Sequence, residues 1–198
     1  MKRSLGISLY PDHSDPQKDR EYIETAHQYG FSRIFMSMLE VTEDPEVVQK
    51  KFQQLIFFAK ERGFETIVDV SPAIFEQLNI SYDDLGFFHR LGADGIRLDL
   101  GFDGRKEALL TFNPYHLAIE LNMSNDVAYL ENILTHQANT SFLYGCHNFY
   151  PQEGTALPYH FFQSSSERFK KTVFERQPSL PHNQVQSGHG ISMMDCLL

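Results

Sequence analysis

Short apolar runs alternate with longer segments in which apolar residues recur at helical spacing. The runs are near-continuously hydrophobic, which is typical of parallel strands buried on both faces. They cover residues 5–10, 33–39, 66–71, 95–100, 117–123 and 141–146. The helical spacing covers residues 15–30, 44–63, 73–92, 126–137 and 160–171, whereas the segment after Leu100 is a weaker helix prediction.

Helix starts and ends support this alternation. Asp-Pro at positions 15–16 and 44–45 is a favourable N-cap and first-turn pair, and Gly30 and Gly63 stand where a C-terminal cap is expected. Six strand-to-helix units therefore repeat at about 25 to 33 residues. This order fits either an open doubly wound sheet or a closed barrel.

The strand ends favour the barrel. The first turn, Tyr-Pro-Asp-His-Ser-Asp, lacks the glycine-rich phosphate fingerprint of a dinucleotide site. Nearly every strand instead ends in polar groups, as on the catalytic face of a (β/α)8 barrel. These groups are Ser8, Asp12, Ser37, Asp69, Ser71, Arg97, Asp99, Glu120, Asn122, His147 and Asn148. We expect an α/β fold of the TIM (β/α)8 type, incomplete because only six of eight units are found.

Composition excludes several classes of partner. The chain has 198 residues, of which 41% are hydrophobic, and a net charge of −9 from 26 acidic and 17 basic residues. No basic block indicates nucleic acid or an anionic membrane as a partner, and no apolar run reaches the length of a membrane span. With no signal-peptide core and only two cysteines, a reduced cytoplasmic protein without disulfides is expected.

The stretch Gly-Cys-His-Asn after the last strand raises the question of a catalytic dyad. Cys146 and His147 are neighbours on a strand and so point to opposite faces, which prevents a nucleophile-base contact between them. Cys146 is interpreted as a small buried hydrophobe, and His147 with Asn148 as the better site candidates. No further ligands at short spacing indicate a zinc site.

Three carboxylates interrupt apolar strands. Asp69, Asp99 and Glu120 lie at or near the ends of consecutive strands, and an acidic residue there is costly unless it is paired or used. Arg97 lies on the same strand face as Asp99, so a structural ion pair is the simplest alternative. Glycoside hydrolysis and metal-dependent isomerisation both use such carboxylates, and spacing does not separate them.

Five motifs together resemble the bacterial 6-phospho-N-acetylmuramidase family, some members of which carry the label "outer surface protein". They are GISLYPDHS, DVSP, GIRLDLGFDG, NPYHLAIELNMS and GCHNFYPQEGTAL, and the resemblance runs from about Lys2 to Lys171. It implies a (β/α)8 barrel followed by a smaller cyclophilin-like domain. The implied activity is cytoplasmic hydrolysis of 6-phospho-N-acetylmuramyl glycosides, phosphorylated amino-sugar disaccharides of cell-wall recycling, without a metal or cofactor.

The resemblance also suggests roles for site residues. Asp99 and Glu120 are expected as the carboxyl pair, with Asp69 in support. Oxygens of the substrate are expected to be bound by Arg97, Asn122, His147, Asn148, Ser8 and Tyr150.

The tail departs from the family pattern. No strand-like run follows Lys171, so we expect a barrel portion at 1–171 and an aberrant or disordered tail at 172–198, without the cyclophilin-like domain. Codons that encode GHGISMMDCLL can, when the reading frame is shifted by two bases, encode the family-like Ala-Trp-Asp-Ile-Asn-Asp-Gly. This predicts a frameshift soon after Lys171. An open remnant would expose a sheet edge, so low stability, self-association and lost activity are expected. The alternatives are a non-catalytic phosphosugar-binding barrel and a metal-dependent isomerase or aldolase.

Overall fold

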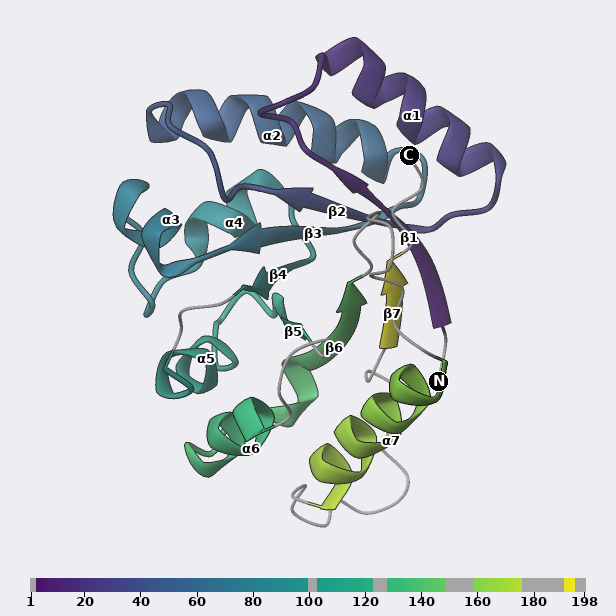
Figure 1. Ribbon diagram of the computed structural model, residues 1–198. Coiled ribbons are helices and arrows are strands. Elements are labelled where there is room, and N and C mark those ends of the chain that lie inside the picture. Colours follow the sequence, from purple (N-terminus) through teal and green to yellow (C-terminus); the bar gives the residue numbers. More distant parts are fainter. Residues whose placement is uncertain (1–2, 100–102, 123–127, 149–158, 176–190, 195–198) are drawn as a thin grey trace.

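Parallel strands form the inner layer of the protein in the computed structural model, which describes residues 3–99, 103–122, 128–148, 159–175 and 191–194 (Figure 1). Each strand pairs with the next along the chain, and the last described strand pairs with the first, so the sheet is a closed barrel. The strands are β1 (Arg3–Leu9), β2 (Arg33–Ser37), β3 (Glu65–Val70), β4 (Gly95–Leu98), β5 (Ala118–Asn122), β6 (Leu143–Asn148) and β7 (Ile191–Met194).

Helices lie on the outside of the strands, with α1 and α2 covering β1 to β3 in Figure 1. The helical region expected after β3 is two short helices, and the weaker prediction after Leu100 is confirmed as a helix. The helices are α1 (Pro16–Gln28), α2 (Pro45–Lys60), α3 (Pro72–Gln77), α4 (Gly86–Leu91), α5 (Arg105–Leu110), α6 (Ala128–Thr135) and α7 (Tyr159–Glu175), with a 3-10 turn at Thr140–Phe142. This order confirms an α/β barrel of the TIM type with fewer than eight described strands.

Strand β7 falls within the tail segment 172–198. Its four residues lie within the segment that we expected to be aberrant or disordered, and they pair in parallel with both β1 and β6. Helix α7 also continues past Lys171 to Glu175. The open edge expected beside β6 is therefore occupied, because the apolar segment Ile191–Met194 supplies backbone donors and acceptors to both neighbours. Self-association through an exposed edge beside β6 is therefore no longer expected.

The ends of α1 follow the expected capping chemistry. The side chain of Asp15 accepts hydrogen bonds from the backbone N–H groups of Gln17 and Lys18, at 2.8 and 3.3 Å. Gly30, just past the end, has a φ of 80°, in the left-handed region that glycine adopts at low cost. Asp44 occupies the corresponding place before α2 without a side-chain cap bond.

Alternate residues of the strands face two different environments. Ile34 and Met36 belong to the large apolar core between the sheet and the helices, together with Phe52 and Ile56 of α2. The residues between them face the barrel interior, where β2 places Phe35 beside a charged group rather than in that core. The sheet thus separates a hydrophobic outer layer from an interior that contains charge.

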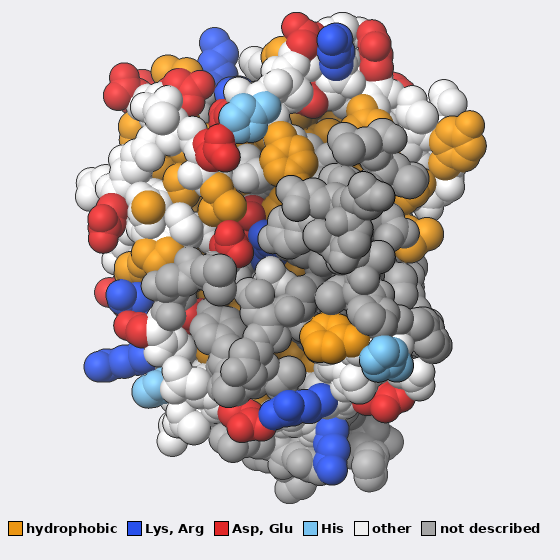
Figure 2. Space-filling model, in the orientation of Figure 1, with side chains coloured by type: hydrophobic (Ala, Val, Ile, Leu, Met, Phe, Trp, Pro, Cys, Tyr) orange, Lys and Arg blue, Asp and Glu red, His pale blue; other side chains and the backbone are white. Residues whose placement is uncertain are grey.

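The surface carries both signs of charge. Figure 2 shows acidic and basic side chains interspersed on the face in view, without a patch of one sign. Within the described part of the chain, no helix combines the length and apolar character that crossing a membrane requires.

Candidate functional site

The sheet register brings the polar residues of β3, β4 and β5 into one layer. Asp69 pairs with Arg97, and Arg97 pairs with Glu120 on the next strand. Paired residues of parallel strands share a face, so all three occupy inward positions on neighbouring strands. The site that the sequence predicts for Asp69, Asp99 and Glu120 stays a prediction.

Asp69 and Arg97 form a two-point ion pair. Both Nε and Nη2 of Arg97 donate to the carboxylate of Asp69, each at 2.7 Å, and the two residues are 3% exposed or less. The guanidinium carbon also lies 4.5 Å from the ring centroid of Phe35. Such two-point contacts fix the plane of the guanidinium as well as its position.

Burial and charge act in opposite directions on this pair. Burial raises the pKa of Asp69 to about 7, although Arg97 acts to lower it. Burial alone would lower the pKa of Arg97, but Asp69, Cys146 and Asp99 together outweigh it and the net shift is upward. The contact geometry is that of a carboxylate with a guanidinium, and we take the ion pair as the form that the fold is built around.

Asp99 is the carboxylate that solvent reaches. It follows β4 directly, its side chain is 24% exposed, and its Oδ1 lies 3.9 Å from Nη2 of Arg97. The ion pair expected between Arg97 and Asp99 is therefore the weaker of two, because Asp69 takes the short contacts. Arg97 links a buried carboxylate to one at the end of the strand.

Glu120 lies deeper than we expected. Its side chain is fully buried, and its Oε1 lies 2.7 Å from Nη1 of Arg33, which is itself 4% exposed. Nε of Arg33 lies 3.2 Å from Oε2 of Glu65. A carboxylate enclosed in this way does not contact a substrate, so the geometry does not support the catalytic role expected for Glu120.

Arg33 is a functional-site neighbour that sequence reasoning missed. It opens β2 and looks like an ordinary polar strand start, but the barrel directs its side chain inward to Glu120 on β5. Two sequence features could have pointed to this pair. Arg33 is a single arginine two residues before Phe35 and so on the same strand face, and Glu120 is a single acidic residue within the later strand β5. Burial acts to lower the pKa of Arg33, yet its carboxylate neighbours raise it overall.

Cys146 and Asn122 share the inward face of β5 and β6. Asn122 pairs with Cys146 in the register, just as Glu120 pairs with Tyr144. Cys146 is fully buried, as expected, and burial raises the pKa of its thiol well above the usual value. Because thiolate is the reactive form, burial and the raised pKa both disfavour Cys146 as a nucleophile.

The remaining predicted residues are placed only in part. Ser8 lies on β1, half-buried. His147 and Asn148 belong to β6 by their backbone, at the register positions of Met193 and Met194, but their side chains lie outside the described part. Tyr150 also lies outside the described residues. Their predicted contacts with a substrate remain predictions.

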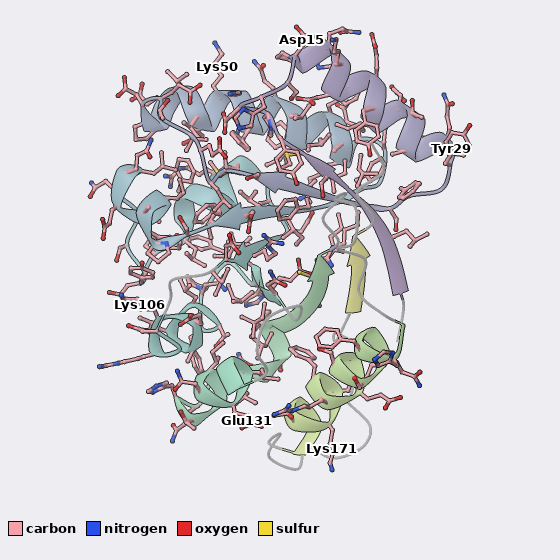
Figure 3. All side chains as sticks on the ribbon, in the orientation of Figure 1. Asp15, Tyr29, Lys50, Lys106, Glu131 and Lys171 are labelled. Atoms are coloured by element: carbon pink, nitrogen blue, oxygen red, sulfur yellow. The ribbon has the colours of Figure 1, made fainter. Side chains whose placement is uncertain are left out.

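A pocket of about 550 Å³ lies outside the barrel, between α1 and α2. Its lining includes Arg20, Glu46 and Lys50, so charges of both signs surround it. Figure 3 shows Lys50 pointing away from the sheet, so this pocket is separate from the inward carboxylates. Among the described residues, no group of three or more His, Cys, Asp or Glu side chains is arranged to hold a metal ion.

Solved structures of similar proteins share this fold. An uncharacterized B. cereus protein is 57% identical, with a TM-score of 0.71 over 87% of this chain and 46% of its own. A conserved Enterococcus faecalis protein with an unknown function is 25% identical, with a TM-score of 0.69 over 86% of this chain and 46% of its own. Citrate synthase SbnG, at 14% identity and a TM-score of 0.57, covers 97% of this chain and 86% of its own and shares the fold alone.

The chain thus spans less than half the length of its two more similar solved relatives. No curated protein matches it. The family described as "6-phospho-N-acetylmuramidase, N-terminal" matches residues 5–188, well beyond Lys171. The chain therefore belongs to the family of N-terminal 6-phospho-N-acetylmuramidase domains.

Proposed function

We propose that the protein acts on 6-phospho-N-acetylmuramyl glycosides in the cytoplasm and hydrolyses the glycosidic bond with Asp99 as a reacting carboxylate. The observation that carries the proposal is the position of Asp99, partly exposed at the end of β4 and facing a guanidinium that a buried carboxylate fixes. Active sites of this fold lie at the carboxyl ends of the strands. The family match supports a phosphorylated amino sugar as the substrate.

The proposed chemistry needs charge held in place. Hydrolysis passes through a transition state with positive character on the sugar, which a fixed carboxylate stabilises. Asp69 holds Arg97, and Arg97 faces Asp99, so Asp69 is proposed to support the reaction without contacting the sugar. Substrate oxygens are proposed to meet Asn122, Asn148, Ser8 and Tyr150. His147 follows the inward Cys146 and so occupies an outward register position, and it is not proposed as a contact.

Hydrolysis also requires a second carboxyl group. Glu120 is no longer proposed for that role, because it is enclosed and paired with Arg33. A barrel that binds the phosphosugar without turnover is the second candidate. It is favoured by the same observation, since Asp99 is the one exposed member of the Asp69, Asp99 and Glu120 set.

A chromogenic glycoside of muramic acid 6-phosphate tests the proposal. We expect release of the chromophore by the chain, unaffected by a chelator, and a loss of about 10²- to 10⁴-fold in Asp99→Asn. Asp103→Asn is the matched control, because Asp103 follows the same strand and its side chain is 54% exposed. It should retain full activity.

The other outcomes separate the candidate functions. Binding without release in the chain would support the phosphosugar-binding barrel instead. Turnover only with added metal would support an isomerase or aldolase. Equal activity in Asp99→Asn and in the unaltered chain would remove Asp99 from the reaction.

A further inference from the structure

Among the described residues, three charged side chains inside the barrel carry buried polar atoms without a hydrogen-bond partner. These atoms include Nη2 of Arg33, Nη1 of Arg97 and Oε2 of Glu120, each with almost no exposed surface. The residues that bear them are 3%, 3% and 0% exposed. An unpaired buried polar atom destabilises the fold, and more so when it is charged, so a group that satisfies all three is strongly favoured.

These atoms belong to one cluster. Arg97 and Glu120 are register partners on adjacent strands, and Arg33 reaches Glu120 across the barrel. Cys146, also inward and fully buried, is within electrostatic range of Arg33, Arg97, Glu120 and Asp69. The two donors and the acceptor thus belong to side chains that register pairing and an ion pair connect.

Charge decides what kind of group fits between them. The two guanidinium groups are balanced by the carboxylates of Asp69 and Glu120, which are the buried anions of the cluster. Asp99 and Glu65 add negative charge at its margins. An added anion would meet a neutral or negative surrounding, whereas a water molecule accepts from two donors and donates to one acceptor without added charge.

We propose that ordered water occupies the barrel interior between Arg33, Arg97 and Glu120, and that Arg33 and Glu120 act through it as positioning residues for Arg97. The water accepts from Nη2 of Arg33 and Nη1 of Arg97 and donates to Oε2 of Glu120. With Nε and Nη2 of Arg97 already held by Asp69, this contact fixes the remaining nitrogen of the guanidinium. The proposed effect of Arg97 on Asp99 rests on the proposed function, whereas the water site does not depend on it.

A high-resolution crystal structure of the chain tests the site directly. We expect water oxygens at about 2.7–3.2 Å from the three atoms. Well-defined density without water, or direct hydrogen bonds among the three side chains, would overturn the proposal. An anomalous peak at this position in a crystal soaked in bromide would also overturn the proposal, because the site would then bind an anion in place of water.

Variants test the positioning role through the titration of Asp69, read by carbon NMR of its carboxyl group. The negative charge of Glu120 raises the pKa of Asp69, so Glu120→Gln should lower it while the amide oxygen keeps the water. Glu120→Leu should remove the water and broaden the Arg97 side-chain signals. Glu65→Gln is the matched control, because Glu65 also pairs with Arg33 but is 43% exposed and lies off the water site.

The control should leave both the water and the Arg97 signals unchanged. If Glu120→Leu fails to fold, Arg33→Met with Glu120→Leu removes the buried pair together and avoids an isolated charge. Unchanged Arg97 signals in every Glu120 variant would overturn the positioning role, whether or not the chain hydrolyses a glycoside. If the water is present but the chain releases no chromophore from the glycoside, that result counts against the proposed function alone.

Discussion

Replacing Arg97 by methionine removes one partner of the buried pair with Asp69. The lost contacts are two hydrogen bonds of 2.7 Å between side chains that are 3% and 2% exposed. Where Asp69 is ionised, breaking the buried ion pair by removing Arg97 costs about 3–5 kcal/mol, because the remaining charge stays in a medium that solvates it poorly. Total stabilities of domains are about 5–15 kcal/mol, so this variant should lose a large fraction of its free energy of unfolding.

The same structure predicts how this loss depends on pH. The pKa of Asp69 is raised from 3.8 to about 7, so the folded state binds its proton more tightly than the unfolded chain does. The contribution of Asp69 to stability therefore falls as the pH rises from about 4 to about 7 and is constant above that. Arg97 acts to lower this pKa, so Arg97→Met raises it further and extends the fall above pH 7. The slope there is at most about 1.4 kcal/mol per pH unit.

Urea unfolding followed by circular dichroism at about pH 5.5, 7 and 8.5 measures both effects. We expect Arg97→Met to be destabilised most at the highest pH. The double variant Asp69→Asn with Arg97→Met removes the titrating group and should show no such dependence between the upper two values. A stability of Arg97→Met that stays level from pH 7 to 8.5 would refute the reasoning, since Asp69 would then not respond to Arg97.

Three further predictions concern packing, reactivity and capping. Gly95→Ala should cost about 1–3 kcal/mol in the same unfolding assay, because the added Cβ would lie 2.6 Å from a backbone oxygen of β5; a neutral result would contradict the tight interior. Cys146, in a chain carrying Cys196→Ser, should react with a thiol reagent only on unfolding, and rapid native-state labelling would show that it is not enclosed. Asp15→Ala should cost about 1 kcal/mol and Asp44→Ala less, because only the first side chain makes cap bonds; equal losses would argue against the capping explanation.

The strands and most helices could be predicted because each depends on a local pattern. Apolar runs gave six strands, and Asp-Pro with a later glycine bounded α1 and α2. Strand β7 could not be predicted in this way, since Ile191–Met194 is short and its place depends on β1 and β6. The out-of-frame origin suggested for this part of the chain stays a prediction that the coding DNA tests.

The sequence indicated which residues belong to the candidate site better than it indicated how deeply each one is buried. Lone acids in apolar strands pointed to Asp69, Asp99 and Glu120, but their distances from the barrel mouth depend on strand stagger, which no local pattern encodes. Alternation showed that Cys146 and His147 face opposite sides without showing which side is inward. The pairing of Asn122 with Cys146 settles that Cys146 is inward. The partnership of Arg33 with Glu120 needed the closed barrel, because it crosses from β2 to β5.

Closure through β7 also bears on how the chain folds as it is synthesised. The first strand pairs on one side with β2, which follows it closely, and on the other with β7, in a register that joins Arg3 to Ile191. Contacts between such distant parts of a chain form late, because the entropy of ordering the intervening loop is lost before they stabilise the fold. On the ribosome, one edge of β1 therefore stays without its partner until residues 191–194 have emerged, and a chaperone that protects that edge should raise the yield of folded protein.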